Sequence, residues 1–185
     1  MRNAMKDICK LLAPPASPRG LDRTWNDVES EIGLSLPDDY KAFIDVYGSG
    51  QITGAAGWIN VWNLRDSSLF RSPLSSDPGG LSSVLREYQS LDATDFRCPF
   101  PIYPAPAGLL PFASVMDVHF LNWLTDGPPS QWAVVYYDFD GCEFNLLTGE
   151  SFSDCILKML RQEYTGLEQP SGLKPPCEFT DFKIR

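Results

Sequence analysis

The feature that most constrains the fold is a pair of short amphipathic helices between residues 24 and 48. Thr24 and Asp27 have the capping-box spacing that begins a helix, and apolar residues three and four positions apart follow them. Gly33 can end this helix in a left-handed conformation, and Pro37 stands at the first turn of the next. We therefore predict helices over residues 25–32 and 37–47, with the side chain of Trp25 in the core.

Most segments with strand character come after this helix pair. Short runs rich in β-branched and aromatic residues predict a hairpin at 51–53 and 58–62, and three further strands at 118–124, 132–138 and 143–146. Helices are predicted to begin at Ser82 or Ser83 and to cover 153–164. This order is not a regular βαβ alternation. It predicts a single α+β domain with a largely antiparallel sheet and helices packed against it.

Proline and glycine suggest where the domain begins and ends. We expect residues 1–20 to form an N-terminal arm and linker, the arm being either a short helix or a loose segment. Residues 21–165 should form the domain, and residues 166–185 a C-terminal tail in which Phe179 and Phe182 contact the body. Five prolines lie between residues 98 and 111. This density predicts an extended wall or loop rather than a central strand.

The chain is acidic, with 15 basic and 24 acidic residues and a net charge of −9. Such a charge disfavours binding to nucleic acids or anionic membranes and favours a basic partner, although acidity also serves solubility alone. No apolar run is long enough to span a bilayer, and residues 1–12 do not resemble a signal peptide. We therefore expect a cytoplasmic protein.

The reactive residue types do not form a catalytic or metal-binding pattern. The five cysteines include no C-x-x-C pair, and His119 is the only histidine, so the sequence predicts no disulfide framework, metal site, cofactor or catalytic residue. His119 is expected to be structural or at the surface.

One motif allows an enzymatic alternative. The apolar segment 133–137 leads into Asp138-Phe139-Asp140-Gly141, which resembles the nucleophile loop of haloacid-dehalogenase-type phosphatases. Only 44 residues follow Gly141, and Cys142 stands where threonine is usual in that family. We interpret the motif as a hairpin turn in which Asp140 and Gly141 supply the required backbone angles.

A longer pattern resembles a known family. The segment from Trp25 to Gly33, then Leu36-Pro37-Asp38-Asp39-Tyr40, and then Tyr47-Gly48-Ser49-Gly50 resembles the N-terminal signature of the SUKH superfamily, in its Smi/Knr-like branch. Residues 110–112 and 123–135 are similar to later parts of the family pattern, and the resemblance extends over about residues 22–164. Residues 113–116 lack the glycine expected there, which leaves that turn open.

This resemblance implies a non-enzymatic α+β domain that binds proteins. Bacterial members are mostly immunity proteins that neutralise a cognate toxin, often a nuclease, whereas fungal members regulate cell-wall assembly and signalling. A basic toxin domain is therefore the expected partner, with an intracellular regulatory scaffold as the alternative. We expect a monomer.

Acidic and aromatic side chains near the last hairpin and the tryptophan-rich strand are the candidate binding residues. Trp58, Asn60 and Trp62 share one face of their strand, which is either a binding surface or part of the packed interior. The predicted partner-binding residues are Trp62, Asp126, Asp138, Asp140 and Glu143.

Overall fold

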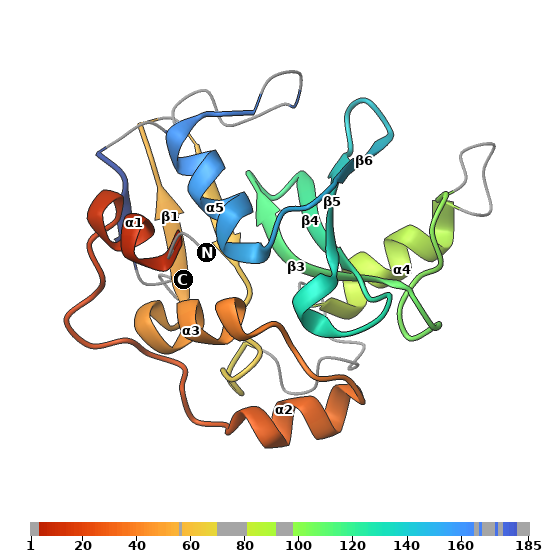
Figure 1. Ribbon diagram of the computed structural model, residues 1–185, viewed down its shortest axis with the longest axis horizontal. Helices are drawn as coiled ribbons and strands as arrows, with labels where there is room; N and C mark the ends of the chain where they lie inside the picture. The colour runs from red at the N-terminus through yellow and green to blue at the C-terminus, as the bar shows by residue number, and fades with distance from the viewer. Residues whose placement is uncertain are drawn as a thin grey trace.

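The computed structural model describes residues 4–55, 57–69, 81–91, 98–164, 167, 173 and 176–180 (Figure 1). Within these residues the strands form one antiparallel sheet in the order β6-β5-β4-β3-β2-β1-β7, confirming the predicted α+β domain with helices packed on the sheet. The elements in chain order are α1 (Ala4–Leu11), α2 (Trp25–Ile32), α3 (Asp38–Tyr47), β1 (Gly50–Thr53), β2 (Trp58–Val61), α4 (Leu81–Leu91), β3 (Leu109–Val115), β4 (His119–Leu124), the 3-10 turn η1 (Pro129–Gln131), β5 (Ala133–Asp138), β6 (Glu143–Leu147), α5 (Phe152–Arg161) and β7 (Glu178–Thr180).

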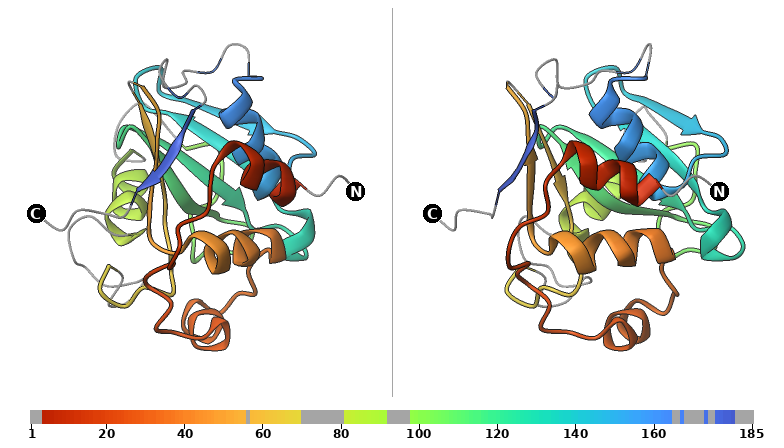
Figure 2. Two further views of the ribbon diagram at one scale, coloured as in Figure 1. Left: turned by 90° about the vertical axis from the view of Figure 1, so that its left-hand side faces the viewer. Right: turned by 60° about the vertical axis from the view of Figure 1, so that its left-hand side comes forward.

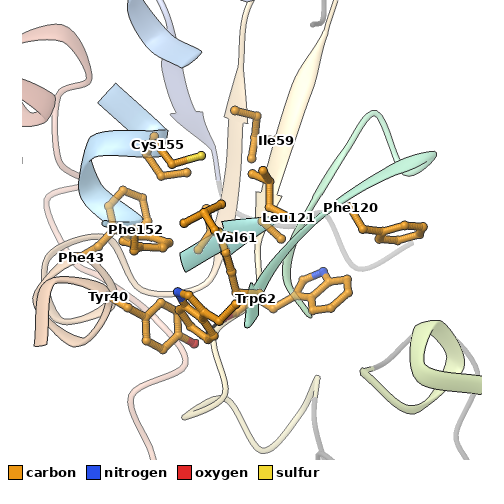
Figure 3. Packing of buried hydrophobic residues seen from close by; sticks show 14 of the residues in the cluster. Tyr40, Phe43, Ile59, Val61, Trp62, Phe120, Leu121, Phe152 and Cys155 are labelled. Carbon is orange, nitrogen blue, oxygen red and sulfur yellow. Dashed lines mark hydrogen bonds between the residues drawn. The ribbon is translucent and has the colours of Figure 1, made fainter. Parts of the chain in front are cut away.

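Helices cover both faces of the sheet. α1, α3 and α5 pack together on one face, and α4 lies across the other (Figures 1 and 2). Figure 3 shows the two layers at residue level: Phe43, Phe152 and Cys155 gather on one side of the sheet, whereas Trp62 and Phe120 point to the other. The sheet is therefore buried on both sides near its centre, and β3 is buried along its whole length.

The helix pair forms as its capping signals predict. Thr24 and Asp27 make a reciprocal capping box, and Gly33 has a φ of 67° at the end of α2. The prediction for Trp25 needs a correction. Its ring lies edge-on to Tyr40 but is only half-buried, because its indole N–H donates to the Asp45 carboxylate at the protein surface.

The expectation for the proline-rich segment is wrong at its end, since Pro111 lies in β3, the central strand of the sheet. The pairing with β4 shifts register between Pro111 and Ala113, and this bulge accommodates a residue that cannot donate a backbone hydrogen bond. The carbonyl of Phe112, inside the bulge, accepts the N–H of Trp62 at 2.9 Å. The bulge thus preserves the link to the neighbouring chain segment.

The turn that lacks the expected glycine lies between β3 and β4. Met116 and Asp117 both adopt positive φ, at 55° and 59°. The Asp117 carboxylate accepts hydrogen bonds from Trp58 Nε1, Asn60 Nδ2 and Ser114 Oγ. These contacts stabilise a turn conformation that glycine or asparagine would adopt at lower cost.

Both segments that flank the predicted domain contact its body. Ile8 and Leu12 are fully buried against α3 and α5, and the Tyr47 hydroxyl donates to the Leu12 carbonyl at 2.7 Å. At the other end Phe179 packs on Tyr47 with ring centroids 5.1 Å apart, as expected for this residue. Phe182 lies outside the described residues. The division at residues 20 and 165 stays a prediction.

Candidate functional site

The turn between β5 and β6 gathers acidic side chains at one end of the sheet. The Asp138 carboxylate accepts the backbone N–H groups of Asp140 and Gly141, each at 3.1 Å, so the D-x-D-G motif is a hairpin turn between antiparallel strands. The prediction that Asp140 and Gly141 supply the unusual backbone angles is wrong. The positive φ of 53° falls on Cys142, because the loop holds four residues instead of two.

His119 contacts the first two residues of this turn. Its Nδ1 lies 3.1 Å from Asp138 Oδ1 and 3.3 Å from the backbone N–H of Phe139, which donates to it. The imidazole is 7% exposed and stacks on Tyr136. The only histidine of the chain therefore helps to position the backbone at the start of the turn by accepting the Phe139 N–H.

Asp138 and Glu143 are directly opposite each other in the register of β5 and β6. Opposite residues in an antiparallel pair project on the same face, and like charges in this position destabilise the pair. Asp140, in the loop between them, is exposed, as is Glu143. A cationic side chain of a partner would relieve the repulsion between Asp138 and Glu143.

Glu150 is also near in sequence but is already neutralised. It accepts a hydrogen bond from Lys158 Nζ at 2.6 Å and another from the Tyr164 hydroxyl. The hydrogen bond to Glu150 raises the pKa of Lys158, which therefore remains charged. Glu150 is thus paired with a cation within the protein, whereas no ion pair of Asp140 or Glu143 is present among the described residues.

Exposed apolar side chains accompany the acidic ones, and sequence reasoning missed them. Phe139 at the tip is 43% exposed and Leu146 on β6 is 47% exposed. Between them Phe144 stacks on Tyr137 with ring centroids 4.4 Å apart. Two signals were available: an aromatic residue inside a tight turn has little to pack against, and adjacent Leu146 and Leu147 in a strand must point to opposite faces.

The structure brings together three of the five predicted binding residues: Asp138, Asp140 and Glu143. Asp126 is exposed in the loop between β4 and β5, at the opposite end of β5 from the hairpin. Trp62 is 9% exposed and packs against Phe120 on the face that α4 covers, so it belongs to the core. We use the term acidic hairpin for residues 138–147.

The described residues form no metal site and no membrane-spanning helix, and the Cys155 thiol is poorly reactive. Across the described parts of the chain, no group of three or more His, Cys, Asp or Glu residues could hold a metal ion. None of the helices within those parts is both long and apolar enough to cross a bilayer. The described cysteines are all free thiols, and burial raises the pKa of Cys155 to about 12, which makes this thiol a poor nucleophile.

The negative charge of the chain is concentrated in the part that contains the acidic hairpin. Residues 98–157 contain seven of the 24 acidic residues and none of the 15 lysines and arginines. They therefore carry −7 of the net charge of −9, and all other residues together carry −2. Most of the net negative charge of the chain thus belongs to the segment from before β3 to the first half of α5.

Comparison with known proteins places the chain in a family. The family described as SMI1-KNR4 cell-wall matches residues 22–154, which are 133 of the 185 residues and include α2 through the first turn of α5. No curated protein and no solved structure gives a significant match. The matched region contains the helix pair, six of the described strands and the acidic hairpin, and the chain belongs to the SMI1-KNR4 family of the SUKH superfamily.

Proposed function

We propose that this protein is an immunity protein that neutralises a basic toxin domain by binding it through the acidic hairpin. The observation that carries the proposal is the charge distribution. Residues 98–157 contain no lysine or arginine. The last hairpin within them carries three acidic side chains, and exposed apolar side chains lie next to these. Charge of one sign steers an oppositely charged partner, and desolvated apolar contacts then hold it.

The family supports this proposal. SUKH proteins are generally non-catalytic and are associated with binding to toxins. A binding role also agrees with the reactive groups of this chain, because Asp138 is bound by the backbone N–H groups of Asp140 and Gly141 rather than aimed at an open site. The neutralised toxin would be basic, as many nucleases are, because polyanionic substrates favour basic proteins.

The first test isolates the partner and then measures how it binds. The purified protein serves as bait in its native organism, and a recovered toxin domain is produced separately for stopped-flow association. We expect the Asp138→Asn, Asp140→Asn double variant to associate about tenfold more slowly at low salt, with a weaker salt dependence. Co-expression of the unaltered protein with the toxin should restore growth of the host.

A matched variant separates local from general charge effects. The Asp38→Asn, Glu178→Gln variant removes the same net charge at exposed positions outside residues 98–157. It should associate at close to the unaltered rate. Equal rates for the hairpin variant and the unaltered protein would rule out the hairpin as the binding surface, and a toxin that stays active in the complex would rule out neutralisation.

A second function is favoured by the cell-wall description of the matched family. In this alternative the chain is a regulatory scaffold that joins endogenous proteins of cell-wall assembly or signalling. Recovery of several such proteins, together with altered wall synthesis when the chain is deleted, would support the scaffold over the immunity protein.

A further inference from the structure

The two edges of the sheet are built differently. At one edge the chain supplies its own added strand, because β7 pairs with β1 through Gln51, Ile52 and Thr53. The ring of Phe179 lies so close to this edge that a Cβ on Gly50 would be 2.5 Å from it. β7 is only three residues long, so this edge of the sheet is short, and the chain itself already pairs along it.

The other edge, β6, lacks several of the features that usually protect an edge strand within the described residues. β6 is five residues long and pairs with β5 in unbroken register from Val134↔Leu147 to Asp138↔Glu143. Its sequence, Glu-Phe-Asn-Leu-Leu, contains no proline and no lysine, and the pairing contains no bulge. Within the described residues the sheet ends at β6. Alternate backbone N–H and C=O groups of such a strand point outward and can pair with another strand.

We infer that β6 is a docking edge to which a basic partner adds an extended strand. The inference rests on the proposed function for the identity of the partner, a basic protein. In this arrangement main-chain hydrogen bonds supply affinity and alternate side chains supply specificity.

The side chains of β6 define the strand that would fit. Phe144 and Leu146 share the face on which Tyr137 and Val135 lie, toward α4, whereas Glu143 and Asn145 share the opposite face with Asp138 and Tyr136. Side chains of paired strands line up on a common face. The incoming strand would therefore alternate apolar residues beside Phe144 and Leu146 with lysine or arginine beside Glu143 and Asn145, on the face that also carries Asp138.

The charges argue against a second copy of this chain as the occupant. Pairing β6 with its own copy would bring two sets of hairpin carboxylates together on a protein with a net charge of −9. The acidic hairpin, residues 138–147, contains three acidic residues and no lysine or arginine. A basic strand gains from the same charges that would repel a second copy.

The test uses a synthetic peptide, so it does not depend on finding the toxin. The probe is a blocked seven-residue peptide that alternates lysine and valine. Its controls are the same peptide with methylated interior backbone nitrogens, which lacks N–H donors, and an alternating glutamate–valine peptide. Binding to isotope-labelled full-length protein is followed by amide chemical shifts and amide hydrogen exchange.

We expect the lysine peptide to shift and protect amides within residues 143–147, and the two control peptides to bind at least about tenfold more weakly. Leu146→Lys should weaken binding of the lysine peptide by a similar factor. The matched variant Leu69→Lys replaces the other leucine that is highly exposed among the described residues, at 39%, and should bind normally.

The inference would be overturned by methylated and unmethylated peptides binding equally, by protection that maps away from β6, or by no binding of the lysine peptide. These outcomes leave the proposed function standing, since a toxin can still contact the acidic side chains alone. Conversely, strand addition by the peptide together with no toxin partner would support the docking edge and contradict the immunity role.

Discussion

The buried hydroxyl of Tyr40 joins α3 to the chain that leaves β2. It donates to the Trp62 carbonyl at 2.6 Å and accepts the Leu64 N–H at 3.4 Å, while its ring lies edge-on to Trp123 and Phe152. Tyr40→Phe would keep the ring but leave two buried backbone groups without their partner. We expect the free energy of unfolding, measured in urea, to fall by about 2 kcal/mol.

Tyr137 provides the matched control. Its hydroxyl is buried without a hydrogen-bond partner in the described part of the chain. Tyr137→Phe should therefore leave the free energy of unfolding unchanged or raise it slightly. If both variants lost the same stability, the hydroxyl of Tyr40 would not be the group that matters.

The sequence could predict only those parts of the candidate site that depend on residues close together in the chain. The grouping of Asp138, Asp140 and Glu143 could be predicted because a turn motif between two strands brings its acidic residues together whatever the rest of the fold does. Trp62 was misplaced for the opposite reason. Alternation puts Trp58 and Trp62 on one face, but whether a helix covers that face depends on α4, which is distant in sequence.

At the scale of elements, α1 is the best test of whether the N-terminal segment belongs to the folded body. Ile8 on α1 has no exposed surface and packs within the core against α5 and α3. Ile8→Ala should lower the free energy of unfolding by about 2–4 kcal/mol through lost burial and a residual cavity. Urea denaturation followed by circular dichroism measures this change.

Lys6 lies on the same helix but is exposed, so Lys6→Ala makes a suitable comparison with a change expected within about 0.5 kcal/mol. A small loss for Ile8→Ala, no larger than that for Lys6→Ala, would show that α1 contributes little to the stability of the body.

The elements found from sequence are those whose periodicity and end signals agree. Capping residues and amphipathic spacing predicted α2 and α3, apolar residues at helical spacing predicted α5, and runs rich in β-branched and aromatic residues predicted β4, β5 and β6. β3 was missed because proline at position 111 argues locally against a central strand, while the bulge that accommodates it forms only when β4 pairs alongside. β7 was missed because three residues carry too little pattern, and it is stabilised by pairing with β1, over 120 residues away.

At the scale of the whole molecule, the interior is rich in buried tyrosine. Burial raises the pKa of six of the seven tyrosine hydroxyls above the usual value of 10.0, to about 12 for Tyr137. The six are Tyr40, Tyr47, Tyr88, Tyr103, Tyr137 and Tyr164. These groups resist ionisation in the folded protein because the phenolate would lose its hydration.

This difference makes stability depend on alkaline pH. Below pH 10 tyrosine is protonated in both states, so the contribution to stability is fully present. Above pH 10 the unfolded chain releases protons that the folded protein retains, and stability falls as pH rises toward the folded-state pKa values. We expect the thermal unfolding midpoint to drop steeply between pH 10 and 12, with tyrosinate absorbance appearing together with loss of circular dichroism. Tyrosinate absorbance near pH 10 in a protein that stays folded would contradict this account of the core.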